Sequence, residues 1–140
     1  MNNEHFWEFN EQVDNVNTPL DIANEIASQL EIVTHQMLMG DISIYFASNS
    51  NKSEIRLYVI APELNNYHYL LISIQEKSIV QSYPAKIILF LDDDKIVVEE
   101  ANNETEFKNS LKNFIQNEFT RNLISKLIGN VKKKRIIEKL

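Results

Sequence analysis

The stretches DISIYF at residues 41–46 and EIRLYVI at residues 54–60 decide the fold of this chain. Both alternate with a period of two, so that Ile42, Ile44 and Phe46 point to one side of a strand while Ser43 and Tyr45 point to the other. The polar residues 48–53 between the two stretches have the composition of a turn. Together these features predict a β-hairpin.

Three more strands are expected after this hairpin, over residues 68–74, 85–91 and 95–99. Pro62 ends the second strand of the hairpin, because proline has no backbone N–H for a strand ladder. The stretch at 85–91 is almost continuously apolar, which predicts a central strand covered on both faces. The five strands follow one another directly along the chain, so we expect a mainly antiparallel meander.

Helical patterns precede the sheet. Residues 4–13 place Phe6 and Phe9 on one face at helical spacing, which predicts a short amphipathic helix. A second helix is expected from Pro19, with Thr18 as its N-cap. Its apolar stripe continues to about Met39, and Gly40 is expected to end it.

One long helix is expected after the sheet. Asn103 and Glu106 form the pattern of a capping box, and apolar residues recur at helical spacing as far as Gly129. The predicted fold is therefore α+β: N-terminal helices, a five-stranded mainly antiparallel meander sheet, and a long C-terminal helix packed on the sheet. We expect a single domain over residues 1–130 and a basic C-terminal tail over residues 131–140.

Charge is distributed unevenly along the chain, whose net charge is −6. Residues 1–125 hold 8 basic and 19 acidic residues, a net charge of −11, whereas the last fifteen residues carry +5. The acidic body would repel phosphate backbones, so we expect no nucleic-acid partner except through the tail. The run from Lys132 to Arg135 could meet nucleic acid, an anionic membrane or an acidic protein, although a solvated chain end explains it more simply.

Several kinds of chemistry are disfavoured by the composition. The chain has no cysteine, and its two glycines exclude the usual phosphate-binding and dinucleotide-binding loops. Its three histidines, His5, His35 and His68, have no zinc-ligand spacing. We therefore expect no cofactor, no metal and no catalytic residue. Because residues 1–7 lack the features of a signal peptide and no apolar run is long enough to span a bilayer, we expect a cytoplasmic protein with no membrane partner.

Acidic residues before the fifth strand suggest an alternative function. Asp92, Asp93 and Asp94 are consecutive, which suits a turn better than a cation-binding loop. Asp93 and Lys95 nevertheless form a D-x-K pair of the kind that metal-dependent nucleases and phosphodiesterases use. Such an enzyme would need a further carboxylate from another strand, for which Asp41 and Glu54 are the candidates.

The second face of the sheet is the best candidate for a partner surface. If Ile42 and Leu57 face the core, Tyr45, Tyr58 and Ile60 lie on the reverse side, and Tyr69 is expected to join them with Leu71. This face is more apolar than a solvated sheet face normally is. Either a helical segment such as residues 4–13 covers it, which we favour, or it is buried against a second chain in a homodimer.

These features predict a non-enzymatic protein-interaction module, such as a small adaptor, an immunity or antitoxin-like protein, or a chaperone-like protein. Its acidic surface suits a basic protein partner. The residues expected to bind the partner are on the sheet face and in the acidic turn: Tyr45, Tyr58, Ile60, Tyr69, Asp92, Asp93 and Asp94.

Overall fold

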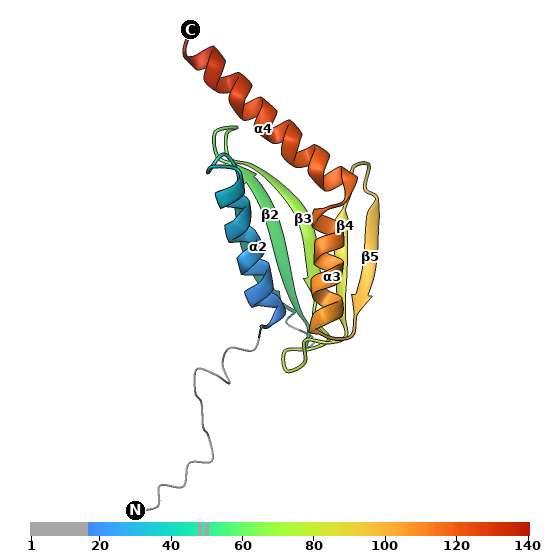
Figure 1. Ribbon diagram of the computed structural model, residues 1–140. Helices are drawn as coiled ribbons and strands as arrows, with labels where there is room; N and C mark the ends of the chain where they lie inside the picture. The colour runs from blue at the N-terminus through green and yellow to red at the C-terminus, as the bar shows by residue number, and fades with distance from the viewer. Residues whose placement is uncertain (1–16, 48, 50) are drawn as a thin grey trace, which may run out of the picture.

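The computed structural model describes residues 17–47, 49 and 51–140 (Figure 1). Its elements are, in chain order, α2 (Pro19–Val33), β1 (Met39–Phe46), β2 (Ser53–Ala61), β3 (Tyr67–Gln75), β4 (Ala85–Phe90), β5 (Ile96–Ala101), α3 (Glu104–Ile115) and α4 (Glu118–Glu138). The α+β class and the five strands are thus confirmed. The helix predicted for residues 4–13 lies outside the described residues.

The sheet is an antiparallel meander with the order β1-β2-β3-β4-β5. Paired residues such as Ile42 and Leu57 share one face, and the register between β2 and β3 shifts once, at Leu57 and Tyr58. β4 is an internal strand between β3 and β5, but the prediction that it is covered on both faces is wrong, because the described helices lie on one face only. Its residues alternate between fully buried and more accessible positions, as in a strand with helices on one side only.

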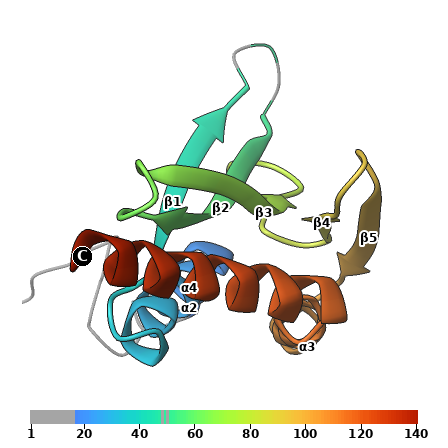
Figure 2. The same cartoon turned by 90° about the horizontal axis from the view of Figure 1, so that it is seen from above.

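The described helices all lie on one face of the sheet, so the described part of the protein has two layers (Figure 2). The core fills the space between the layers and includes Ile55, Leu57, Ile72, Ile74, Ile87, Leu89, Phe107, Leu111 and Phe114. No described helix covers the other sheet face. This one-sided arrangement leaves a broad sheet surface whose side chains alternate with those of the core.

Helix α2 begins as predicted but ends earlier. The Thr18 side chain and the Asp21 side chain cap each other's backbone N–H groups, with Pro19 in the first turn. The helix ends at Val33 rather than near Met39, because the chain turns there: His35 has a φ of 51°. Gly40 does not end the helix but lies in β1.

The C-terminal helix is two helices rather than one. Asn103 caps α3 by accepting a hydrogen bond from the N–H of Glu106, as predicted. The helix breaks after Ile115, where Asn117 caps α4 and the Thr120 hydroxyl donates to the carbonyl of Phe114. The prediction that the helix ends at Gly129 is also wrong.

Most of the region predicted as a basic tail, residues 131–138, is part of α4. α4 continues to Glu138, and Val131 has no exposed surface. A helix that covers the core on one side can carry basic residues on the others, so a run of basic residues at a chain end does not by itself indicate a tail. The end of α4 extends past the other elements (Figure 1).

Candidate interaction surfaces

The open sheet face carries cross-strand apolar pairs. Met39 lies opposite Ile60 on β1 and β2, Tyr58 opposite Leu70 on β2 and β3, and on β4 and β5 two further pairs occur: Ile88 with Val98 and Phe90 with Ile96. Ile96 is 52% exposed and Val98 47% exposed. We call the face formed by these residues, together with Asp41, Tyr45 and Arg56, the open sheet face.

Two of the tyrosines that the sequence analysis assigned to the partner surface are held in place on this face. Tyr45, 45% exposed, lies under the Arg56 guanidinium carbon at 4.2 Å from the ring centroid, and Arg56 also forms an ion pair with Glu54. The hydrogen bond from Arg56 to Glu54 raises the pKa of the guanidinium. The Tyr58 ring contacts the His68 ring edge to face, at 6.5 Å between centroids. These contacts hold both tyrosine rings in place on the open sheet face.

Tyr69 does not join them. It pairs with Val59, so it lies on the face that the helices cover, where its ring packs 6.0 Å from that of Phe119. Its hydroxyl donates to the carbonyl of Phe90 at 2.7 Å, and burial raises the pKa of this hydroxyl. Leu71 is also buried. The shift in register beside Tyr58 explains the error, because strict alternation along β3 does not survive it.

The three aspartates form the turn between β4 and β5. Asp93 and Asp94 have φ values of 60° and 58°, and the N–H of Lys95 donates to the carbonyl of Asp92. Aspartate tolerates this left-handed conformation better than most residues. All three side chains are exposed, and a single residue separates the turn from Phe90 on one side and from Ile96 on the other. The acidic turn therefore borders the apolar part of the open sheet face.

The residues of the nuclease alternative are not brought together. Asp41 lies in the edge strand β1, whereas Asp93 follows β4, at least three strand spacings of about 4.8 Å away across the sheet. Within residues 17–47, 49 and 51–140, no group of three acidic or histidine side chains could hold a metal ion. Asp41 therefore cannot supply the further carboxylate that the D-x-K pair would need, and no metal-binding group of three such side chains occurs in the described part of the chain.

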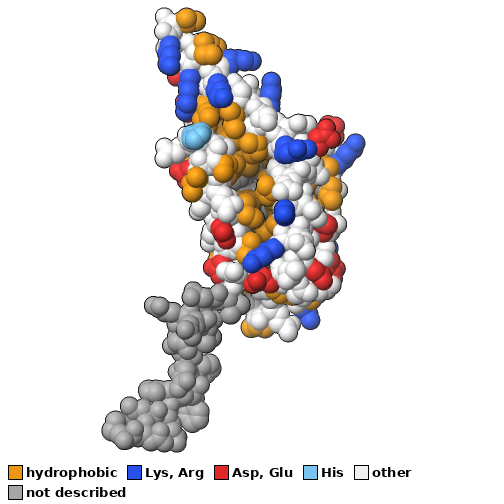
Figure 3. Space-filling model, viewed as in Figure 1, with side chains coloured by type: hydrophobic (Ala, Val, Ile, Leu, Met, Phe, Trp, Pro, Cys, Tyr) orange, Lys and Arg blue, Asp and Glu red, His pale blue; other side chains and the backbone are white. Residues whose placement is uncertain are grey.

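A groove lies between the helices on the other side of the molecule. It has a volume of about 830 Å³, and its walls are α2 and α3, with the first turns of α4 at one end and strands β2 and β3 as its floor. Figure 3 shows apolar side chains gathered between α2 and α3. The apolar lining residues are Ile22, Ile26, Leu30, Leu57, Val59, Leu71, Leu111, Ile115 and Ile124.

Cations dominate one side of this groove. Lys108, Lys112 and Arg121 line it from α3 and α4, while Glu25 of α2 is its only acidic lining residue within the described part of the chain. Lys108 forms an ion pair with Glu104 at 3.4 Å. Lys112 and Arg121 form no ion pair with any described residue. The sequence revealed the apolar stripe of α2 but not this groove, because the width of the groove depends on the spacing between α2 and α3.

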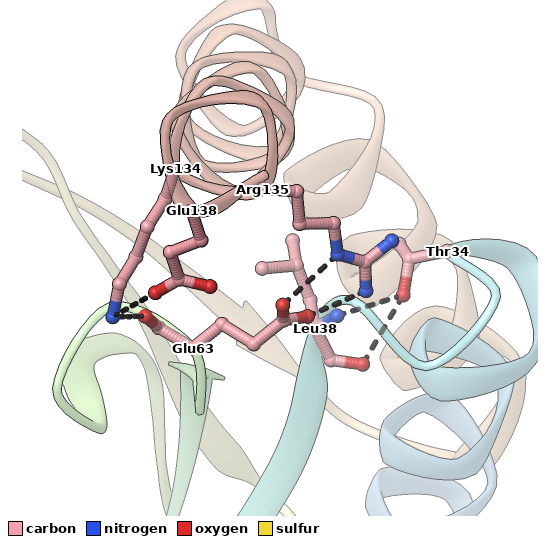
Figure 4. Close-up of polar contacts among 6 residues, drawn as sticks. All are labelled: Thr34, Leu38, Glu63, Lys134, Arg135 and Glu138. Atoms are coloured by element: carbon pink, nitrogen blue, oxygen red, sulfur yellow. Dashed lines mark hydrogen bonds and ion pairs between the residues drawn. The ribbon is translucent and has the colours of Figure 1, made fainter. Parts of the chain in front are cut away.

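The far end of α4 is attached to the turn after β2 (Figure 4). Arg135 makes two hydrogen bonds to the Glu63 carboxylate, of 2.9 and 2.5 Å, and Lys134 donates to the Glu63 carbonyl. The bond to Arg135 lowers the pKa of Glu63. Nearby, the Thr34 hydroxyl accepts a hydrogen bond from the Leu38 N–H at 3.1 Å and shapes the turn after α2. Part of the basic run thus has a structural role, which the sequence alone did not indicate.

The class defined by these features is a two-layer α+β protein with an open sheet face and an apolar interhelical groove. No protein-family model matches the chain, and the searches found no curated protein and no solved structure similar to it. None of the described helices combines the length and apolar character needed to cross a membrane.

Proposed function

We propose that this protein is a non-enzymatic protein-interaction module, and that its open sheet face binds a partner protein with apolar and basic side chains. The observation that carries the proposal is that paired apolar residues occur across all five strands, on the sheet face that the described helices leave open. Ile96 and Val98 are about half exposed, on a face that no described helix covers. Contiguous exposed apolar patches with a polar rim are typical of interaction sites.

Charge supports a basic partner. The open sheet face carries Asp41 at the β1 edge, and the acidic turn 92–94 adjoins its apolar pairs near the opposite edge. Carboxylates at the rim of an apolar patch attract basic partners and speed their association. Because Asp92, Asp93 and Asp94 are exposed and have no ion pair with any described residue, their charge is available to a partner.

The partner-binding residues of the proposal are Tyr45, Tyr58, Ile60, Asp92, Asp93 and Asp94. Tyrosine is enriched in interfaces because a rigid ring supplies contact area and its hydroxyl stays hydrated. An acidic, preorganised surface of this kind suits an adaptor, a chaperone-like protein, or an immunity or antitoxin-like inhibitor of a basic protein. The protein is proposed to act in the cytoplasm.

Photo-crosslinking in the native cells tests this proposal. A photoreactive phenylalanine analogue at position 96 should form adducts with another polypeptide, whereas the same analogue at position 133, on an exposed part of α4, should not. The triple variant Asp92→Asn, Asp93→Asn, Asp94→Asn should reduce the adduct yield severalfold. Asparagine tolerates positive φ, so the turn should keep its shape while losing its charge. The triple variant Glu25→Gln, Glu31→Gln, Glu118→Gln is the control, because it removes three carboxylates from the helical side.

Three results would contradict the proposal. Equal adducts from positions 96 and 133 would show that the open sheet face has no special role. An unchanged yield in the asparagine variant would exclude a charge-assisted contact at the turn. Adducts that contain only a second copy of this chain would make the face a homodimer interface.

A further inference from the structure

We propose that residues 4–13 of this chain occupy the groove between α2 and α3, with Trp7 and the neighbouring phenylalanines against its apolar floor. The proposal goes beyond the proposed function, because it concerns the opposite side of the molecule. The groove in the described part of the chain leaves Ile26, Leu30 and Ile124 only partly buried next to the core. Covering these side chains would remove apolar surface from water and stabilise the fold.

The segment has the side chains that such a groove requires. Residues 1–16 contain Phe6, Trp7, Phe9 and Val13, and the spacing predicts an amphipathic helix over 4–13. Isolated helices this short are marginal in water, so the segment needs a surface on which to fold. An amphipathic helix laid into an apolar groove is a common mode of peptide recognition.

Charge complementarity selects the groove over the open sheet face. Residues 1–16 carry four carboxylates and no lysine or arginine. Lys112 and Arg121 line the groove and form no ion pair with a described residue. The open sheet face instead carries Asp41 and adjoins the acidic turn, and its Arg56 is already paired with Glu54, so these carboxylates would repel the segment.

The connection between the segment and the groove is short. Residue 17 immediately precedes the N-cap of α2, and α2 lines the groove from Ile22 to Val33. A 15-residue helix such as α2 is about 22 Å long, and a helix over 4–13 would be about 15 Å long. A chain that reverses direction at residues 14–17 would therefore fit alongside α2.

Trp7 is the only tryptophan in the chain, so its fluorescence reports on the segment in the full-length protein. The proposal predicts an emission maximum shifted to the blue and acrylamide quenching several-fold weaker than in the urea-unfolded protein. The double variant Lys112→Glu, Arg121→Glu should move the emission to the red and raise the quenching several-fold, because both changes put carboxylates beside an acidic segment. Both residues are exposed, so the fold should survive, which circular dichroism would verify.

A matched control reverses two exposed charges outside the groove, in the variant Lys133→Glu, Lys139→Glu, and should leave Trp7 unchanged. The proposal is overturned if Trp7 is as accessible in the native protein as in the unfolded chain. It is also overturned if Ile96→Glu, on the open sheet face, exposes Trp7 while the groove variant does not. Loss of Trp7 protection on dilution would assign the segment to the groove of a second copy and would likewise contradict the proposal.

Discussion

Gly40 of β1 lies directly against Ala27 of α2. A Cβ atom added to Gly40 would lie 2.5 Å from the Cα of Ala27 and 2.6 Å from its Cβ, closer than nonbonded carbon atoms approach. The first strand therefore packs on the first described helix at a point where only glycine fits. Because α2 is also one wall of the groove, this contact sets the position of that wall over the sheet.

The variant Gly40→Ala should be destabilised. The added methyl group meets the backbone of Ala27, which cannot move without shifting α2, so we expect a loss of about 1–3 kcal/mol in the free energy of unfolding. Gly129→Ala is the matched control, because nothing lies within 4 Å of a Cβ there and the residue is inside α4. It should gain about 0.5–1 kcal/mol. Urea denaturation measures the change in the free energy of unfolding for both variants. Equal changes at the two positions would contradict the Gly40 contact.

Tyr69→Phe should lower stability without altering the fold. The variant keeps the ring against Phe119 but removes the hydrogen bond to the Phe90 carbonyl, at a cost of about 1 kcal/mol. Tyr45→Phe is the comparison, since the Tyr45 hydroxyl has no hydrogen bond with a described residue and its loss should leave stability nearly unchanged. Thermal denaturation followed by circular dichroism distinguishes the two. A larger loss of stability in Tyr45→Phe than in Tyr69→Phe would contradict the position of Tyr69 on the helix-covered face and its hydrogen bond to Phe90.

The contact between Glu63 and α4 should depend on pH. Arg135 lowers the pKa of the Glu63 carboxyl, so the contact stabilises the fold above the pKa of glutamate in the unfolded chain. This stabilisation is lost as the pH falls through the lower pKa of the folded state. A carboxyl-carbon NMR titration should place the Glu63 midpoint below that of an ordinary glutamate, and Arg135→Gln should raise it. An identical midpoint in the variant would contradict the contact.

Divalent metal ions should have no specific effect on the protein. The three aspartates form a turn, and the described residues offer no group of three acidic or histidine side chains for a metal site. Mg²⁺ or Mn²⁺ should therefore leave the melting temperature unchanged in the wild type and in Asp93→Asn. A rise in melting temperature that Asp93→Asn abolishes would instead support the metal-dependent nuclease or phosphodiesterase.

The local signals in the sequence predicted most elements of the fold. The caps at Thr18 and Asn103 and the alternation in the strands depend on short-range chemistry, and the structure has them where expected. The break at Asn117 was missed because the apolar stripe continues across it. Positive φ values occur at asparagines 65 and 66 and also at aspartate, histidine and glutamine residues, so several residue types other than glycine adopt the left-handed conformation in the described turns.

The candidate surfaces were less accessible to sequence reasoning. Alternation placed Tyr45 and Tyr58 on the open sheet face correctly, because their register with neighbouring strands is regular up to the bulge. Tyr69 was misplaced because a bulge depends on the partner strand as well as on the local sequence. The groove and the contact between Glu63 and Arg135 join segments far apart in the chain, and no local pattern indicates either.

The solution mass tests most directly whether the open sheet face binds a different protein rather than a second copy. Light scattering of the purified protein should give a monomer mass near 16.3 kDa, both for the wild type and for Tyr58→Asp. A wild-type mass of twice that value, reduced to the monomer mass in a folded Tyr58→Asp variant, would show that the face is a homodimer interface and would contradict the proposed function.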